Sequence, residues 1–382
     1  MKVPFFRLKI SDEEIDEVNQ VLRAGWVTTG PKVKELEQLI VAYTGAKYAC
    51  AVSSATAGLH LVLEALDLSF DNEIITTPYT MAATIESIIY TGAKPVLVDI
   101  DPGTLNINPA KIAEAVSSDT RAIMAVDIAG FPADYDTIRK IADRHNLTIL
   151  SDAAHSLGAL QRGKKVGTLA DATVFSFYST KNITTGEGGM VVSDNKGLID
   201  KIRHLSLHGM TSSGWKRNQG GSWEYDITEL GFKYNMSDIN AALGVGRMKR
   251  FESLQKRRKE IARYYIEHLN DLSEYLELPD TDKIDHHAWH LFIIKLKLEN
   301  LKIDRNQFID ELDKAGVGCS VHFMPIYHFS YFELIFDYSP DDFPYCEDSF
   351  SRVVSLPMYP DLTDEEVDYV CRMVQNIVHR SI

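Results

Sequence analysis

Two segments carry side chains suited to chemistry on a carbonyl group. In FSFYSTKNITTGEGG, Lys181 occupies a polar, glycine-rich loop that follows an aromatic run. Burial in such a loop would lower the pKa of the amine, and a neutral amine attacks carbonyl carbon. In SDAAHSLGA, Asp152 ends an apolar run and His155 follows three positions later. A single loop lysine is usually a solvated charge and a strand-ending aspartate usually caps a helix, so each pattern needs support from another.

A third segment, SSATAGLHL, is suited to binding a phosphate. Ser54, Ala55 and Thr56 open a predicted helix directly after a predicted strand. Free backbone N–H groups and hydroxyls at a helix N-terminus bind phosphate, although a plain N-cap uses the same residues. A phosphate-binding turn, then an aspartate, then a lysine is an order that suits a pyridoxal 5′-phosphate (PLP) site. There a lysine forms a Schiff base and an aspartate keeps the pyridine nitrogen protonated. The chain has no GxGxxG, GxxxxGK[ST] or HExxH motif.

Alternating short runs of β-branched residues and amphipathic stretches must position these side chains. The predicted strands are Tyr48–Ser53, Glu73–Thr77, Pro95–Ile100, Arg121–Asp127, Leu147–Asp152, Ala172–Phe177 and Gly189–Ser193. Stretches with helical apolar spacing separate the first five. This alternation predicts an α/β fold with a parallel sheet covered on both faces. Because ligands of such sheets bind at the carboxyl ends of the strands, we expect the functional residues there.

The rest of the chain predicts a second, smaller unit. Residues 208–223 (HGMTSSGWKRNQGGSW) read as a long loop, and loops of that length inside a domain are usually functional. One long helix is predicted from about Ser237, its N-cap, to Leu269. The remaining sequence resembles a small α/β cap. We therefore expect a large domain over residues 1–245, including an N-terminal arm, and a small C-terminal domain over residues 246–382.

Composition excludes several classes of protein. The 382 residues carry a formal charge of −14, so general binding to nucleic acid or to an anionic membrane is not expected. The N-terminus lacks the apolar region of a signal peptide, and no window approaches 18 uninterrupted apolar residues. The four cysteines form no CxxC pair, which argues against a zinc or dithiol site. These features predict a cytoplasmic protein.

The sequence also resembles a known family along nearly its whole length. The motifs are GWVTTGPKVKELE, SSATAG, DIAGFPAD, DAAHSLGA, FSFYSTKNITTGEGG, LHG, GFKYNMSDINAALG, HAWHLFII, VHFMPIYH and SLPMYPDLT. In this order they resemble the DegT/DnrJ/EryC1/StrS group of PLP-dependent nucleotide-sugar aminotransferases. The resemblance implies PLP fold type I, with a mostly parallel seven-stranded sheet and a smaller C-terminal α/β domain. KNIT…EGG, KYNMSDINAA and HAWHLFII are especially similar to the enzymes that make UDP-4-amino-4-deoxy-L-arabinose.

The resemblance implies roles for particular residues. Lys181 matches the Schiff-base lysine, Asp152 the partner of the pyridinium nitrogen, and His155 a residue near the ring. The phosphate-binding positions, with the adjoining N-cap serine, fall on Ser54, Ala55, Thr56 and Ser176.

Asn235, in GFKYN, matches a residue that reaches the phosphate in the neighbouring subunit's site, which implies a homodimer with shared active sites. The ring-stacking position, commonly Phe or Trp in the family, falls here on Met81 in TTPYTMAAT. A thioether can pack on an aromatic face. Tyr79 is a nearby alternative.

Three further groups have both a structural and a functional interpretation. His286, His287 and His290 have near-helical spacing, but in the family this segment leads into a strand, so we predict no metal site. His322 and Tyr327 belong either to the core or to the wall of a sugar site. In the long loop, Arg217 could bind a diphosphate, or the loop could be plain surface.

The expected activity is a ping-pong transfer of an amino group from L-glutamate to a keto-sugar linked to UDP or dTDP. Its product would be an amino sugar for surface polysaccharide, lipid A or a glycosylated metabolite. One alternative is a sugar dehydratase of the same fold, in whose relatives histidine replaces the lysine, unlike Lys181 here. The other is a non-catalytic sensor or regulatory protein, which predicts a missing lysine or an added DNA-binding segment. The sequence does not distinguish amination at C3 from amination at C4.

Overall fold

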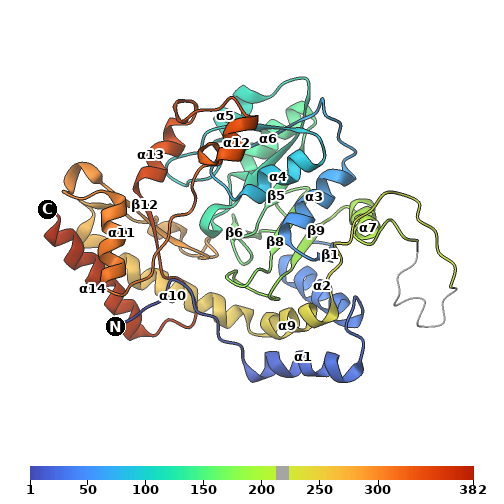
Figure 1. The fold of residues 1–382 in the computed structure, drawn as a ribbon, viewed down its shortest axis with the longest axis horizontal. Coiled ribbons are helices and arrows are strands. Elements are labelled where there is room, and N and C mark those ends of the chain that lie inside the picture. Colours follow the sequence, from blue (N-terminus) through green and yellow to red (C-terminus); the bar gives the residue numbers. More distant parts are fainter. Residues whose placement is uncertain (212–222) are drawn as a thin grey trace.

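A seven-stranded sheet forms the centre of the larger part of the molecule (Figure 1). The computed structural model describes residues 1–211 and 223–382. The sheet order is β1-β9-β8-β5-β4-β2-β3, and every neighbouring pair is parallel except the two pairs made by β9. The strands are β1 (Tyr48–Val52), β2 (Glu73–Thr76), β3 (Lys94–Leu97), β4 (Thr120–Val126), β5 (Thr148–Asp152), β8 (Ala172–Ser176) and β9 (Gly189–Ser193). The predicted strands and the mostly parallel sheet are confirmed.

Helices cover both faces of this sheet because its strands are apolar on both sides. In β1, Ala49 and Ala51 pack with one set of helices, whereas Cys50 and Val52 pack with another. Such alternation follows from the two-residue period of a strand. The helices of this part are α1 (Asp12–Ala24), α2 (Pro31–Thr44), α3 (Ala55–Ala65), α4 (Ala82–Tyr90), α5 (Pro109–Ala115), α6 (Tyr135–His145), α7 (Lys196–Leu205) and α9 (Asp238–Lys249). A small hairpin pairs β6 (Leu160–Gln161) with β7 (Lys164–Lys165).

The C-terminal part is built on a three-stranded antiparallel sheet of β10 (Leu276–Glu277), β11 (Phe292–Leu296) and β12 (Val353–Leu356). Its helices are α10 (Phe251–Leu269), α11 (Arg305–Lys314), α12 (Ser330–Ile335), α13 (Pro344–Arg352) and α14 (Asp364–Arg380). Short 3₁₀ turns lie at Ile128–Gly130, Asn270–Leu272, Thr281–Lys283, Leu298–Asn300, Ile326–His328 and Pro340–Asp342. The N-terminus also reaches this part, since Val3 pairs with Val317 and is buried in its core.

Capping residues in the sequence fix where several helices begin. Ser11 and Glu14 form a capping box at α1, and Thr363 and Glu366 form another at α14. Each box satisfies two backbone N–H groups that have no partner within the helix. The predicted N-cap at Ser237 is confirmed, because its side chain accepts from the amide of Asn240.

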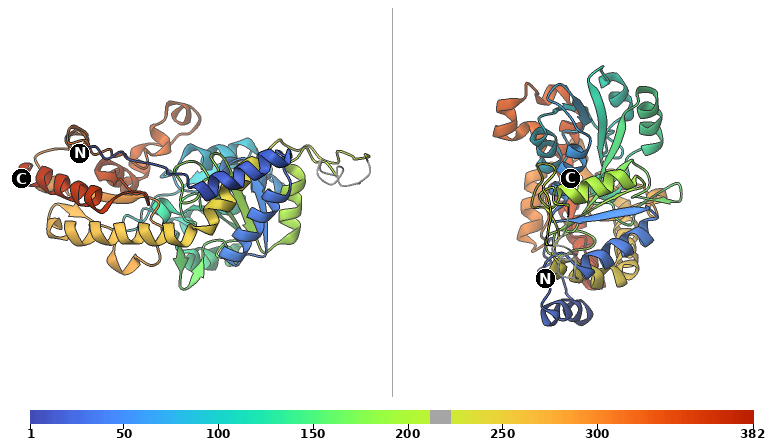
Figure 2. Two further views of the ribbon diagram at one scale, coloured as in Figure 1. Left: turned by 90° about the horizontal axis from the view of Figure 1, so that it is seen from below. Right: turned by 90° about the vertical axis from the view of Figure 1, so that its right-hand side faces the viewer.

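The single long helix predicted from Ser237 to Leu269 is instead two helices, α9 and α10, which follow one another from the large part to the small one (Figures 1 and 2). The break is at Arg250, where φ is −106° and ψ is 0°. The Arg250 amide bonds to the Arg247 carbonyl, which tightens the last turn of α9. Its side chain forms an ion pair with Glu14 of α1. A local apolar pattern does not encode such a contact.

Within residues 1–211 and 223–382, no helix has the length and apolar content needed to cross a bilayer. Over the same ranges, no group of three His, Cys, Asp or Glu side chains is arranged to ligate a metal. The expected division between residues 245 and 246 falls inside α9 and stays a prediction.

Candidate active site

A cavity of about 360 Å³ opens at the carboxyl ends of β5 and β8, where sites of parallel sheets are found. The small C-terminal part supplies one of its walls with His290, His322 and Phe323. Nine of the sequence-predicted residues line it together: Ser54, Ala55, Thr56, Met81, Asp152, His155, Ser176, Lys181 and His322.

Asp152, the last residue of β5, is buried and held by two donors. Its Oδ2 accepts a hydrogen bond of 2.8 Å from the hydroxyl of Thr84 in α4. Its Oδ1 accepts a bond of 3.2 Å from the Ala154 amide. Burial raises the pKa of this carboxyl, and the two hydrogen bonds and the Lys181 amine oppose the rise. The two hydrogen bonds therefore fix the direction of the carboxylate, and its burial favours pairing with a cation.

Lys181 lies in the turn that follows β8, where its amide bonds to the Tyr178 carbonyl. Burial lowers the pKa of its amine to about 8, against the attraction of the Asp152 carboxylate. At about pH 8 half of such amines are neutral, and a neutral amine can act as a nucleophile or a base.

Two histidine rings lie beside this lysine. His155 and His290 are both buried, and their ring centroids are 4.3 Å apart. His155 also stacks on Phe323 at 5.6 Å. Burial and the nearby Lys181 cation both contribute to holding the pKa of each imidazole well below its usual value. Both rings are therefore neutral at physiological pH.

The first turn of α3 forms an anion-binding corner of the cavity. The Ser54 hydroxyl accepts from the Ala57 amide as an N-cap. The amides of Ala55 and Thr56 precede the first intrahelical bond, and both residues face the cavity. A phosphate there would meet N–H groups and the positive end of the helix dipole.

Met81 and Tyr79 lie in very different surroundings. Met81 lines the cavity and is 60% exposed. Tyr79 is fully buried, and its hydroxyl donates to the His322 carbonyl. Tyr79 does not line the cavity. The expectation that Tyr79 stacks on the cofactor ring in place of Met81 is therefore wrong, because the Tyr79 ring packs in the core.

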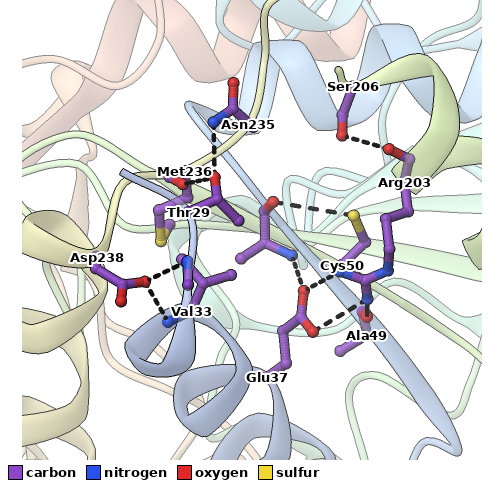
Figure 3. A network of polar contacts seen from close by, with 12 residues as sticks. Thr29, Val33, Glu37, Ala49, Cys50, Arg203, Ser206, Asn235, Met236 and Asp238 are labelled. Carbon is purple, nitrogen blue, oxygen red and sulfur yellow. Dashed lines mark hydrogen bonds and ion pairs between the residues drawn. The ribbon is translucent and has the colours of Figure 1, made fainter. Parts of the chain in front are cut away.

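The structure does not place three other predicted residues in this cavity. Tyr327 is buried, stacks on Phe343 and donates its hydroxyl to Glu347, so it is no wall of this site. Asn235 lies in the network of Figure 3, where its side-chain amide donates to the Thr29 hydroxyl at 2.6 Å. Arg217 lies outside the described residues.

Figure 3 also shows what anchors the segment of Asn235. Thr29 donates to the Met236 carbonyl at 2.6 Å. Asp238, at the start of α9, accepts from the amides of Gly30 and Val33 at the start of α2. Asn235 therefore lies beside a hydrogen-bonded junction between α2 and α9.

The comparison with known families decides the identity of the chain. Residues 8–375 match the DegT/DnrJ/EryC1/StrS aminotransferase family. The chain belongs to this family.

Several known proteins are similar to this chain over nearly their whole length. SpsC of Bacillus subtilis, a spore coat polysaccharide biosynthesis protein, is 42% identical over 98% of this chain and 97% of its own. Spr1654 of Streptococcus pneumoniae, described as a sugar aminotransferase, was solved in a pyridoxamine phosphate (PMP) form. It superposes with a TM-score of 0.93 at 32% identity over all of both chains. DesI, solved with its TDP-sugar product, gives 0.87 at 30% identity over 97% of this chain and 91% of its own.

PLP is the cofactor of this family member, and the residues present fit it. Spr1654 was solved in a PLP form as well as the PMP form. In this chain, a lysine amine, a buried carboxylate and free first-turn amides converge on one cavity. Gly189 packs so closely on the phosphate corner that a Cβ would lie 2.6 Å from the Ser54 backbone. Lys181 would hold PLP covalently, Asp152 would hold its ring nitrogen and α3 its phosphate.

Sequence reasoning missed residues that support the predicted ones. Thr84 bonds Asp152, and Thr80 shares a 2.7 Å hydrogen bond with Thr84. His290 was weighed only as a metal ligand, yet it contacts Lys181. Hydroxyl side chains near the start of α4 were a weak sequence signal for Thr80 and Thr84. No local signal marked His290.

Proposed function

We propose that this protein is a PLP-dependent aminotransferase that moves the amino group of L-glutamate to the keto group of a nucleotide-linked sugar. The observation that carries the proposal is the meeting of Lys181, Asp152 and the α3 N-terminus in one cavity. An amine of lowered pKa, a buried carboxylate and an anion site are the set that transamination through PLP requires.

Each residue of the cavity has a separate role in the proposed reaction. PLP, when bound, supplies an electron-withdrawing ring that stabilises negative charge on the Cα of an attached amino compound. Lys181, once its amine is free, takes the Cα proton of the donor and returns a proton to the acceptor. Asp152 keeps the proton on the ring nitrogen, because a buried carboxylate without a cation nearby is costly. Thr84 and the Ala154 amide fix the direction of that carboxylate.

The substrate class is supported by the relatives. DesI was solved with a TDP-sugar product, and SpsC takes part in spore coat polysaccharide synthesis. The resemblance to enzymes of UDP-4-amino-4-deoxy-L-arabinose makes a UDP-linked 4-keto pentose the first acceptor to test, with dTDP-linked 4-keto hexoses next. His322 lines the cavity and is proposed as part of the sugar wall. The product would enter a surface polysaccharide or a related glycoconjugate.

We also propose that the protein acts as a homodimer in which Asn235 serves the partner's phosphate site. In this chain Asn235 does not line the cavity, which is compatible with service to another copy. The nearby segment exposes large apolar side chains, with Trp223 82% and Leu230 91% exposed. Apolar exposure of this kind marks surfaces that associate.

The test is the visible spectrum of the PLP-loaded protein before and after addition of L-glutamate, with no sugar present. The proposal expects the PLP band to bleach to the PMP form in the wild type. Lys181→Ala should hold no borohydride-stable PLP and turn over at least about 10³-fold more slowly, because the proton carrier is missing. Lys164→Ala, an exposed lysine of β7, is the matched control and should behave as wild type.

Two results would contradict the proposal. Normal glutamate turnover by Lys181→Ala would remove Lys181 from the chemistry. A wild-type protein that binds PLP but keeps its spectrum unchanged with glutamate and with other amino acids would instead be a non-transaminating member of the fold.

A further inference from the structure

The segment of residues 287–291 separates two cavities, and its residues alternate between them. His287, Trp289 and Leu291 line a second cavity of about 260 Å³ on the far side of the segment. His290 lines the cavity that contains Lys181. Trp289 has a positive φ of 51°, and the next residue, His290, faces the cavity on the opposite side of the segment from Trp289.

His290 contacts the lysine directly. Its Nε2 lies 3.5 Å from Nζ of Lys181. The side chain is buried, and its Nδ1 has no hydrogen-bond partner among the described residues. The buried ring thus has one polar contact within the described chain, and that contact is with Lys181.

The proton positions follow from what each group can do. A lysine ammonium only donates, so Nε2 must be the accepting nitrogen and the imidazole proton must sit on Nδ1. Burial, then His155, Lys181, Arg258 and His322, lower the pKa of His290. The ring therefore stays neutral and keeps its accepting lone pair at physiological pH. When the lysine amine is neutral, one of its N–H groups can still donate to Nε2, which leaves the nitrogen lone pair pointing elsewhere.

The backbone around His290 is held firmly enough for such a role. Arg258 of α10 donates to the Trp289 carbonyl at 2.9 Å and to the Met358 carbonyl at 3.0 Å. The amide of Leu291 bonds to the Ala129 carbonyl at 3.1 Å, and that of Ala288 to the Gly130 carbonyl at 2.8 Å. The segment is tied to both parts of the molecule.

We propose that His290 is a positioning residue for Lys181: its neutral imidazole accepts one N–H of the free amine and directs the amine's lone pair into the cavity. This inference rests on the proposed role of Lys181. The inference adds His290 to the proposed site as a residue that orients Lys181.

Loss of the acceptor, Nε2 of His290, has two effects on Lys181, and they act in opposite directions on its reactivity. The ammonium loses a hydrogen bond, so the pKa of the Lys181 amine falls by about one unit. The neutral amine loses its orientation, so its rate of attack on an aldehyde falls by about tenfold even where it is fully deprotonated. The ionisable groups that face Lys181 or His290 are Asp152 from β5, His155 from the following turn, Arg258 from α10 and His322 from the small part.

The experiment measures how fast the apoenzyme captures PLP, from about pH 6 to about pH 10, by absorbance and by borohydride-stable incorporation. His290→Phe keeps a ring of similar shape without an acceptor and should lower both the pH midpoint and the high-pH rate. His290→Gln places an amide near the position of Nε2 and should restore both toward wild type. His287→Asn is the matched control and should leave both unchanged, since His287 faces the second cavity and the amide oxygen of Asn can still accept from the Trp289 amide, as Nδ1 of His287 does.

A purely structural role for His290 would lower the Tm without moving the midpoint, so the Tm of each apoenzyme is recorded alongside. If His290→Phe does not fold, His290→Asn takes its place, because its amide lies on the Nδ1 side and leaves Lys181 without an acceptor. A wild-type midpoint and rate in a folded His290 variant overturn the inference, as does an equal shift in His287→Asn. Lys181→Ala tests the proposed function separately: borohydride-stable capture of PLP by that variant would overturn the role of Lys181 itself.

Discussion

Individual side chains in this site act in pairs. Asp152 alone is a costly buried carboxylate, and Thr84 makes its burial tolerable by donating a 2.8 Å hydrogen bond. Lys181 alone is a buried amine, and the neutral His290 accepts from it without adding a positive charge. At the ring-stacking position, Met81 offers a flexible thioether in place of a flat ring.

The Thr84–Asp152 bond can be tested by an isosteric change. Thr84→Val keeps the shape but removes the donor, so the pKa of Asp152 rises further and its hold on a ring nitrogen weakens. We expect a loss of about 1 kcal/mol in PLP binding, about fivefold in Kd, with slower glutamate bleaching. Absorbance titration with PLP measures the former. Thr91→Val is the control, because the Thr91 hydroxyl lies at the other end of α4, where it donates to the Ile88 carbonyl and accepts from the Ala93 amide. Equal Kd values for both variants would contradict this role of Thr84.

At the scale of elements, β9 determines how closely α3 approaches the sheet. Gly189 opens β9 and pairs with Val52 at the end of β1 and with Ser176 at the end of β8. Because β9 runs antiparallel to both, its first residue lies at their carboxyl ends. The absence of a side chain there lets the first turn of α3 sit against the strand ends.

Gly189→Ala tests this close approach. The added Cβ would lie 2.6 Å from the Ser54 carbonyl carbon, so the phosphate corner must move. We expect the free energy of unfolding to fall by about 1–3 kcal/mol, as overpacked sites do, and PLP to bind more weakly. Urea denaturation and PLP titration measure the two effects. Gly197→Ala in α7, whose nearest contact would be 3.4 Å, should leave stability unchanged or raise it slightly. A stable Gly189→Ala protein with normal PLP affinity would show that the corner adjusts freely.

At the scale of the whole molecule, the cavity is assembled from segments of both parts. The large part supplies Asp152 from β5 and Lys181 from the turn after β8, and the small part supplies His290 and His322. α9 and α10 join these parts, and the N-terminal Val3 packs in the small core. The segment before Asn235 carries exposed apolar groups on an edge that the proposed dimer would cover.

Mixing two inactive variants tests the shared site. Lys181→Ala lacks the amine, and Asn235→Ala lacks the side chain proposed to reach the partner's phosphate. If the sites are shared, each mixed dimer holds one intact site, so statistical mixing should restore about a quarter of wild-type activity. Co-refolded mixtures assayed against each variant alone provide the measurement, with light scattering to report the dimer. Activity that never exceeds the sum of the separate variants would show that Asn235 acts within its own chain or not at all.

The sequence by itself determined the strands, the helices between them and the order of the PLP-binding segments. These features depend on residue periodicity and on turn chemistry, which act over a few positions. The position of Ser237 as an N-cap is an example of such a local rule.

Only the tertiary structure decided which side chains complete the site. Thr84 meets Asp152 across 68 residues of chain, and His290 meets Lys181 across 109. The burial of Tyr79, the exposure of Met81 and the break at Arg250 likewise result from packing between distant segments. No local pattern encodes such contacts, because they depend on how the sheets and helices are placed against one another.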